Sequence, residues 1–227
     1  MNLQILFEDE NIIVCYKPSG VATQTAKVGT PDMVSLLKNY LYKKDQKEPY
    51  VAVIHRLDQP VEGILVFAKT PAAAKELSRQ VQQGGGFGKY YKAVVCGKLN
   101  ASKGVLENYL IKDGKSNTSR VCSASERDAK KAVLNYDVLD TEEVEGQMRS
   151  LLRIKLGTGR HHQIRVQMAN AGCPIWGDTK YGKTEAAAWQ RIALCAYKLE
   201  FIHPKTRKTM TFEIEPEGEG FRCFHRL

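Results

Sequence analysis

The sequence predicts an α+β fold built on a large, mixed and mostly antiparallel sheet. Short apolar runs typical of strands recur along nearly the whole chain, whereas only three segments show helical spacing of apolar residues. Few of those helices stand between two strands, where the crossover of a parallel sheet would place them. We find no internal repeat and no low-complexity segment, so a solenoid fold is not expected.

The first elements expected along the chain are a hairpin and a helix. Two apolar runs, residues 3–7 and 12–16, flank a polar turn, which is typical of paired strands. The helix is expected over residues 31–42, because apolar side chains recur there at helical spacing and Pro31 suits a first helical turn.

The remaining elements are also predicted from helical spacing of apolar residues or from short apolar runs typical of strands. Helices are expected over residues 71–82, which begin with a proline and precede three glycines, and over residues 161–171, which precede Gly172 and Pro174. Strands are expected at residues 51–54, 64–68, 89–96, 105–112, 132–139, 150–155, 192–202 and 209–215. The polar stretch 112–131 reads as a loop, and the sequence leaves open whether it is a mobile insertion or a lid.

The amino-acid composition indicates which class of molecule the protein binds. The 227 residues include 34 Lys and Arg against 25 Asp and Glu, which gives a formal net charge of +9. A positive excess favours polyanions such as RNA, although a merely basic protein has the same balance. The apolar content of 43% is that of a globular protein and argues against a disordered chain.

Cysteine usage and the lack of targeting signals suggest a cytoplasmic location. The six cysteines stand singly without any C-x-x-C pair, which argues against a zinc ribbon or a redox motif. The first residues lack the basic and apolar pattern of a signal peptide, and no apolar run reaches the ~18 residues of a membrane span. We therefore expect a cytoplasmic protein with reduced thiols and no membrane partner.

Two segments place candidate functional residues in or beside runs that are typical of strands. Asp58 precedes the turn at Pro60, and a lone aspartate at such a place is more often a turn former than a catalyst. His55 is expected to be packed or hydrogen-bonded. In the pair Tyr90 and Tyr91, one ring should face inward and the other outward, because adjacent strand residues alternate between faces.

Two further segments are rich in glycine. Residues 157–165 place a flexible basic turn before a helix, whose free N–H groups suit phosphates. The histidines in this segment, His161 and His162, are adjacent and lack the four-residue spacing of a helical zinc pair, so no metal site is expected. Residues 172–182 combine Gly, Pro, Trp and Tyr and read as a fixed structural loop.

Taken in order, these segments resemble the RluA-type pseudouridine synthase family. The matching motifs are KPSG (17–20), HRLDQPVEGILVFAK (55–69), KYYKAVVCGKL (89–99), GRHHQIRVQMANAGCPIWGDTKYG (159–182) and LCAYKLEFIHPKT (194–206). Five motifs in the family's order make a chance match implausible. The resemblance implies a single catalytic domain over residues 1–227, with a central cleft across the sheet and no N-terminal RNA-binding domain.

The resemblance also implies roles for four residues. Asp58 matches the catalytic aspartate, and Tyr91 matches the tyrosine that lies against the target base. Arg165 matches the basic residue that pairs with the aspartate, and Arg56 matches an arginine that helps to fill the space left by a flipped nucleotide. The implied reaction is the isomerisation of uridine to pseudouridine in structured RNA, either tRNA or large-subunit rRNA, by a monomer that needs no cofactor and no metal.

Four positions depart from the family pattern. Val61 and Glu62 stand where Thr and Ser are usual, and Gln167 and Cys195 replace histidines. Glu62 brings a second carboxylate four residues from Asp58, which could raise the pKa of Asp58 if the two face each other. Two alternatives stay open: a degenerate member that binds RNA as a chaperone, and a glycoside hydrolase that uses these two carboxylates.

Overall fold

The computed structural model describes residues 3–25, 27, 29–44, 47–83, 86–182 and 191–224. The chain divides into two compact units, the first comprising Met1–Lys89 and Ala196–Glu215 and the second Tyr90–Cys195 and Pro216–Leu227. The boundary falls inside two strands, because β5 (Phe87–Cys96) continues past Lys89 and β10 (Leu194–Ile202) begins before Ala196. The single catalytic domain and the central cleft stay predictions.

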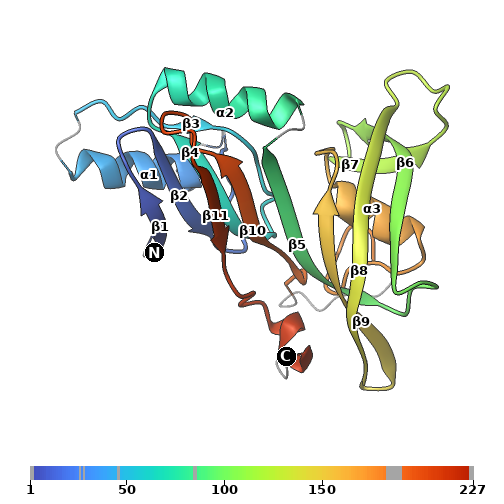
Figure 1. Cartoon of the computed structure of the whole chain (residues 1–227). Helices are drawn as coiled ribbons and strands as arrows, with labels where there is room; N and C mark the ends of the chain where they lie inside the picture. Colours follow the sequence, from blue (N-terminus) through green and yellow to red (C-terminus); the bar gives the residue numbers. More distant parts are fainter. Residues whose placement is uncertain are drawn as a thin grey trace. The chain divides into compact units, whose positions relative to one another are not determined.

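The first unit is built on antiparallel strands (Figure 1). Its strands run in the order β1 (Ile5–Glu8), β2 (Ile12–Lys17), β4 (Glu62–Ala68) and β10, with β3 (Ala52–Val53) beside β4 and β11 (Thr209–Glu213) beside β10. The β1–β2, β2–β4, β3–β4 and β10–β11 pairs are antiparallel. The hairpin expected at the start of the chain is therefore confirmed, and the two strands expected near its end pair with each other.

Two α-helices are found in the described part of this unit. α1 (Met33–Tyr42) begins after Asp32, whose side chain accepts a hydrogen bond from the N–H of Ser35. Because this capping box fixes the start, Pro31 precedes the helix and the expectation that it lies in the first turn is wrong. α2 (Pro71–Gln83) starts at its proline as expected.

The core of the first unit explains why β2 and β4 read as nearly unbroken apolar runs. Every residue of both strands is buried, so neither strand needs a polar face. α2 contributes Ala73 and Leu77 to a cluster with Ile12, Val66 and Phe201. This packing supports β2 and β4 side by side, which matters because the candidate catalytic loop precedes β4.

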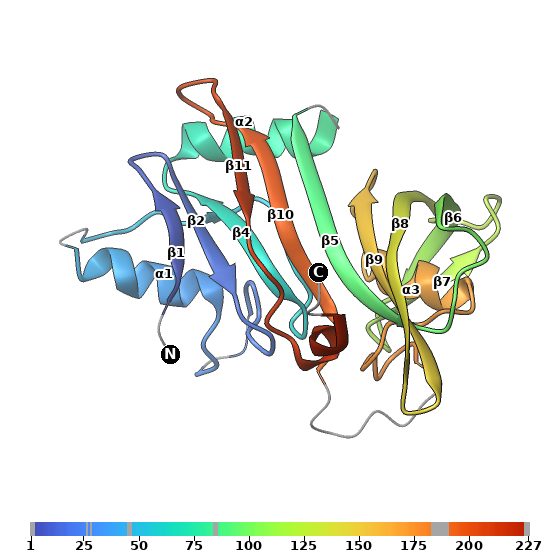
Figure 2. The same cartoon turned by 60° about the horizontal axis from the view of Figure 1, so that its bottom comes forward.

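Within its described residues, the second unit combines antiparallel strands with one α-helix (Figure 2). Its strands run in the order β5, β9 (Gln147–Leu156), β8 (Lys130–Val144), β6 (Lys103–Asp113) and β7 (Thr118–Cys122). The helix α3 (Gln163–Asn170) packs on these strands through Val166, which joins a small apolar cluster with Leu110 and Ala132. A short 3-10 helix, Glu219–Phe224, follows near the C-terminus.

The polar stretch 112–131 is not simply a loop, so that expectation is corrected. Residues 118–122 form the strand β7, which pairs with β6 in an antiparallel hairpin. Three of its five side chains, Thr118, Ser119 and Arg120, are polar, so apolar periodicity could not reveal it. The strand depends on main-chain pairing with β6 and on a hydrogen bond between Ser119 and His161.

The fold class is confirmed as α+β with a mixed, mostly antiparallel sheet and few helices. The other expected elements are found with boundaries that shift by a few residues. No helix within the described part of the chain is long and apolar enough to cross a membrane.

Candidate functional site

Arg56 and Asp58 lie in the loop that connects β3 to β4. The side chain of Arg56 is exposed and that of Asp58 is partly exposed, so both are open to a ligand. The main-chain carbonyl of Asp58 accepts a 3.0 Å hydrogen bond from the N–H of Val61. That bond closes a tight turn, and the chain then enters the buried strand β4. The aspartate is therefore both the turn former expected from its sequence and an accessible carboxylate.

The side chain of Lys17 anchors this loop from the protein interior. It is fully buried, and its ammonium donates hydrogen bonds to the carbonyls of Pro18 (3.1 Å), Val21 (2.7 Å) and Gln59 (3.0 Å). Three acceptors use all three N–H groups of the charged form. Burial lowers the pKa of Lys17 to about 7, whereas the carboxylates of Asp58 and Glu62 act in the opposite direction.

Further hydrogen bonds tie the Asp58 loop to the segment after β2. Thr23 donates its hydroxyl to the carbonyl of Leu57 (3.0 Å) and accepts the N–H of the same residue (3.2 Å). Gly20 exchanges two hydrogen bonds with Gln59, and its φ of +89° explains why a glycine ends the KPSG motif. Asp58 thus stands between two residues whose main chains are fixed.

Glu62 occupies the first position of β4 and is buried. Its carboxylate accepts a 2.8 Å hydrogen bond from the hydroxyl of Tyr16. Because both Glu62 and Asp58 act electrostatically on Lys17, one buried cation compensates part of the negative charge of two carboxylates. The carboxylate of Glu62, which departs from the family pattern, therefore interacts within the first unit with the hydroxyl of Tyr16 and with the ammonium of Lys17.

His55 is unsuited to the role of a general base. Its ring packs edge-on against Phe87, with the centroids 5.3 Å apart, and its Nε2 accepts the N–H of Val66 at 3.4 Å. Desolvation by burial, with a smaller contribution from Lys89, lowers the pKa of His55 to about 3. The ring is neutral near pH 7, which agrees with its expected role as a packed residue.

Tyr91 and Arg165 belong to the second unit and are both buried, at 6% and 3% exposure. Tyr90, the neighbour of Tyr91 on β5, is less buried, and the ammonium of Lys155 lies 5.3 Å from the centre of its ring. The two rings differ in burial, as expected for adjacent residues of a strand. The position of the Asp58 loop relative to these two residues stays a prediction, as does the pairing of Arg165 with Asp58.

Arg165 forms a bidentate ion pair with Asp178. Its Nε donates to Oδ2 at 2.8 Å, and its Nη2 donates to Oδ1 at 2.6 Å. The same guanidinium lies 5.2 Å from the centre of the Tyr181 ring. Both charged side chains are almost fully buried, so each compensates for much of the other's lost hydration. Two hydrogen bonds and a ring contact thereby fix the orientation of Arg165.

The residues around this pair form a network that the sequence motifs do not reveal. The hydroxyl of Tyr181 accepts the N–H of Ser119 at 2.7 Å and lies 2.8 Å from Nδ1 of His162. The rings of His161 and His162 stack with centroids 3.7 Å apart, and Nδ1 of His161 lies 2.9 Å from the Ser119 hydroxyl. The sequence indicates this network only through the Gly-Asp and Tyr-Gly pairs within residues 177–182. By themselves these pairs predict a structural loop.

The other basic residue of this segment has a different environment. Arg160 is exposed, and its Nε donates to the carbonyl of Lys131 at 2.8 Å, whereas Arg165 is buried against Asp178. In the part of the chain that the structure describes, no three His, Cys, Asp or Glu side chains gather as they would around a metal ion.

Two of the departures from the family pattern are buried. Gln167 lies on α3 with no exposed surface, and its amide nitrogen donates hydrogen bonds to the Leu106 carbonyl (3.1 Å) and the Asn108 side chain (2.9 Å). It therefore connects α3 to β6. Cys195 is also fully buried, near the start of β10. Both positions are closed to bulk solvent, which is consistent with a role in packing.

Comparison with known proteins identifies the family. Residues 11–170 match the family model described as RNA pseudouridylate synthase. The chain belongs to this family. The matched range includes the four residues named from the resemblance, Arg56, Asp58, Tyr91 and Arg165. Membership of this family argues against the glycoside hydrolase alternative.

Several curated pseudouridine synthases are similar over most of this chain. The uncharacterised RNA pseudouridine synthase YhcT of Bacillus subtilis is 34% identical over 211 residues, covering 93% of this chain and 68% of that protein. The ribosomal large subunit pseudouridine synthase D of Nitrosomonas europaea is 34% identical, covering 93% and 61%. The dual-specificity RNA pseudouridine synthase RluA of Salmonella typhi is 33% identical, covering 93% and 92%. The RluA-type resemblance is thus confirmed.

Solved structures of pseudouridine synthase domains share the fold. Human RNA pseudouridylate synthase domain containing 4 is similar with a TM-score of 0.79 and 22% identity, covering 99% of this chain and 92% of that one. Human RNA pseudouridylate synthase domain containing 1 has a TM-score of 0.76 and 23% identity, covering 95% and 84%. At these identities the likeness supports the fold and not a substrate.

Proposed function

We propose that this pseudouridine synthase converts uridine to pseudouridine in structured RNA, with Asp58 as the catalytic residue. The observation that carries the proposal is an accessible aspartate on a loop fixed by the buried ammonium of Lys17. Because the main chain is fixed on both sides of Asp58, the motion of its carboxylate is limited. A catalytic group has to be held in this way in the geometry that the reaction requires.

The reaction requires a carboxylate and no redox change. The bond between ribose and a ring nitrogen breaks, the uracil turns, and ribose is joined to the carbon at the fifth ring position. Asp58 could attack covalently or remove a ribose proton, and both routes use the ionised form. Either route ends with loss of the hydrogen from the fifth ring carbon and protonation of the released nitrogen, so the net change is an isomerisation.

The target uridine must leave its helix to reach the carboxylate. Extrusion costs a few kcal/mol, which contacts with the flipped nucleotide and with the vacated space would offset. We assign the stacking role to Tyr91 and the filling role to Arg56, which is exposed as insertion into RNA requires. We also assign to Arg165 the role of pairing with the carboxylate of Asp58, as the family resemblance implies.

The names of the similar proteins point to two substrate classes. One relative is named for the ribosomal large subunit and another for dual specificity. For this chain we propose tRNA or large-subunit rRNA as the substrate, a cytoplasmic location and a monomeric state. The formal net charge of +9 supports a polyanionic partner.

The proposal is tested by tritium release from transcripts labelled at the fifth carbon of uracil. Bulk tRNA and rRNA transcripts are incubated with the wild-type chain, with Asp58→Asn and, as a matched control, with Asp137→Asn, which removes an exposed carboxylate paired with Arg153. We expect release by wild type and control and none by Asp58→Asn, which should still bind RNA. Turnover by Asp58→Asn contradicts the assigned role of Asp58.

A degenerate family member that only binds RNA is the second candidate. The buried Glu62 favours it, because a carboxylate stands here in place of the usual serine. The same assay separates the two functions. RNA binding by the wild-type chain without tritium release from any transcript would support the chaperone and contradict catalysis.

A further inference from the structure

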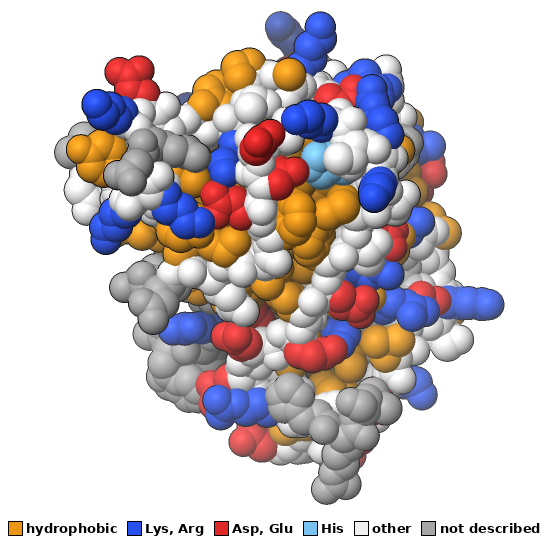
Figure 3. Space-filling model, turned by 60° about the vertical axis from the view of Figure 1, so that its left-hand side comes forward, with side chains coloured by type: hydrophobic (Ala, Val, Ile, Leu, Met, Phe, Trp, Pro, Cys, Tyr) orange, Lys and Arg blue, Asp and Glu red, His pale blue; other side chains and the backbone are white. Residues whose placement is uncertain are grey.

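Two exposed tyrosines lie close to the end of α1, outside the Asp58 loop. Tyr42 is 64% exposed and Tyr50 is 43% exposed. Within the described residues five large hydrophobic side chains are exposed, and these two are the aromatic ones. Figure 3 shows the side of the molecule that α1 occupies, where Lys, Arg, Asp and Glu side chains are interspersed with hydrophobic ones. Burial of an aromatic ring is strongly favourable, so two rings left in solvent on one small surface suggest a site where something binds.

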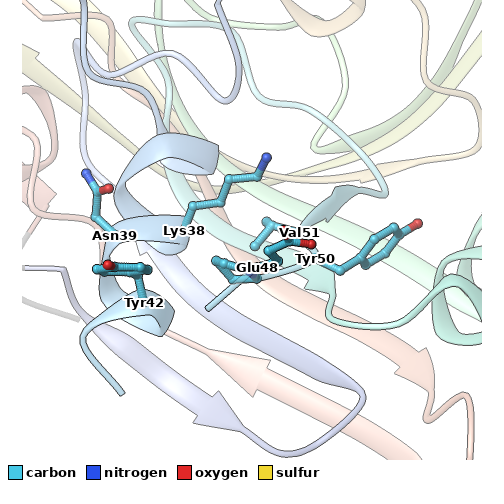
Figure 4. A pocket seen from close by; sticks show the side chains of 7 residues that line it. Lys38, Asn39, Tyr42, Glu48, Tyr50 and Val51 are labelled. Atoms are coloured by element: carbon cyan, nitrogen blue, oxygen red, sulfur yellow. The ribbon is translucent and has the colours of Figure 1, made fainter. Parts of the chain in front are cut away.

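The tyrosines line one depression in the surface of the first unit. Its volume is about 550 Å³, and its lining residues are Lys38, Asn39, Tyr42, Glu48, Pro49, Tyr50 and Val51. In Figure 4 Lys38, Asn39 and Tyr42 project from the last turns of α1, and the labelled side chains of residues 48, 50 and 51 come from the extended segment beside it. We call this surface the tyrosine patch.

Helical spacing explains why the patch faces outward. Leu37 and Leu41 are fully buried, so the positions that follow each of them, Lys38 and Tyr42, lie together on the outer face of α1. A lysine four residues before a tyrosine thus places a cation next to an exposed ring. Replacing either outer residue leaves the buried face of the helix unchanged.

Lysines outnumber acidic residues among the described residues that line the patch or adjoin it in the sequence. Lys38, Lys43 and Lys47 are exposed, and the ion pairs found among the described residues include none of them. Lys44 pairs with Glu8 at 2.9 Å, and Glu48 is the acidic residue in the lining. Exposed cations that belong to none of the ion pairs recorded for the described residues favour an anionic ligand.

We propose that the tyrosine patch binds an unpaired stretch of RNA. Bases would stack on Tyr42 and Tyr50, while Lys38, Lys43 and Lys47 would hold the phosphates; this combination of rings and cations is typical of surfaces that bind single strands without reading their sequence. A protein partner is less suited to the patch, because lysines are depleted in the cores of protein interfaces. The inference rests on the proposed function, since it assumes that RNA is the substrate.

The patch gives the enzyme a second contact with its substrate. Unpaired nucleotides that extend from the modified helix would bind there while the target uridine is at Asp58. Linking two weak contacts on one RNA raises the overall affinity by effective concentration. The patch would therefore favour RNAs in which the target helix adjoins a single strand.

The test measures binding of a fluorescein-labelled oligouridylate, about 12 nucleotides long to match a typical single-strand site, by anisotropy. The parent protein is the Asp58→Asn chain. Variants of it carry Tyr42→Ala with Tyr50→Ala, Tyr42→Phe with Tyr50→Phe, or, as a control, Val105→Ala with Met148→Ala, which removes two other exposed apolar side chains. A thermal melt of each variant checks its fold, and a salt titration with Lys38→Gln checks the phosphate contact.

We expect the alanine pair to weaken binding by about tenfold or more and the phenylalanine pair to bind as the parent does. Lys38→Gln should reduce the dependence of log K on log salt by about 0.7. Unchanged binding by the alanine pair, an equal loss in the control, or no binding of the oligouridylate by the parent overturns the proposal. Because the assay uses an inactive chain, its failure is separate from failure of the tritium assay.

Discussion

The ammonium of Lys17 donates a 3.0 Å hydrogen bond to the main-chain carbonyl of Gln59, the residue that follows Asp58. Two further carbonyls, of Pro18 and Val21, complete its set of acceptors. A single buried amino group therefore holds together the segment after β2 and the loop before β4. The KPSG and HRLD motifs, which are separate in the sequence, are parts of one structure.

Replacement of Lys17 by methionine should loosen this structure. The variant leaves three carbonyls without their charged donor, and we expect the free energy of unfolding to fall by about 2–5 kcal/mol. Urea unfolding measures the change. Lys75→Met on the exposed face of α2 is the control, expected within about 0.5 kcal/mol of wild type. If both variants have the same stability, the carbonyls gain no stabilisation from Lys17.

Much of the fold could be predicted because its elements follow simple periodicities. The buried strands β2 and β4 are largely continuous apolar runs, and α2 begins at a proline. The strand β7 could not be predicted in this way, since its residues are largely polar and its pairing partner β6 supplies the main-chain hydrogen bonds. The start predicted for α1 is two residues early, because the capping side chain of Asp32 outweighs the preference of Pro31 for a first turn.

The candidate site was only partly accessible from the sequence. Residues in motifs could be named, but their support comes from partners elsewhere along the chain, such as Asp178 for Arg165 and Thr23 for Leu57. Long-range hydrogen bonds leave no periodic signal, so spacing alone cannot reveal them. The roles of Arg56, Asp58, Tyr91 and Arg165 come from family resemblance and stay predictions.

Neutralisation of Asp178 should destabilise the second unit. Asp178→Asn removes the charge of the carboxylate that forms the buried bidentate pair with Arg165, and we expect a loss of about 3–5 kcal/mol in the free energy of unfolding. The control is Asp137→Asn, which breaks the exposed ion pair with Arg153 and should cost at most about 1 kcal/mol. Chemical unfolding of both variants gives the comparison, and equal losses would show that burial of the pair is unimportant.

His55 should make the fold sensitive to acid. Its pKa is lowered from 6.5 to about 3 in the folded chain, so between these values the unfolded chain binds a proton that the folded chain does not. The contribution of neutral His55 to the free energy of unfolding is therefore fully present above pH 6.5. This contribution declines as the pH falls toward 3. On going from about pH 7 to about pH 4.5, His55→Gln should lose about 2–3 kcal/mol less than wild type. Parallel stability curves for the two proteins in urea would contradict this.

Gly63 should tolerate no side chain, because it combines an unusual backbone angle with a close contact. Its φ is +137°, and a Cβ atom would lie 2.5 Å from the carbonyl oxygen of Ala196. Gly63 also pairs with Lys17 across the β2–β4 ladder, so a shift of this backbone would displace the anchor of the Asp58 loop. We expect Gly63→Ala to lower the free energy of unfolding by at least about 2 kcal/mol and to reduce tritium release.

The matched control for this substitution is Gly114→Ala in the β6–β7 hairpin, where an added Cβ atom would meet no other atom within 4 Å. That variant should unfold and turn over as wild type does. Thermal melts and initial rates on the same transcript distinguish the two glycines. A Gly63→Ala protein that keeps both its stability and its rate would mean that the backbone at β4 and β10 can separate without disturbing Lys17, and the proposed link between this contact and the Asp58 loop would then be wrong.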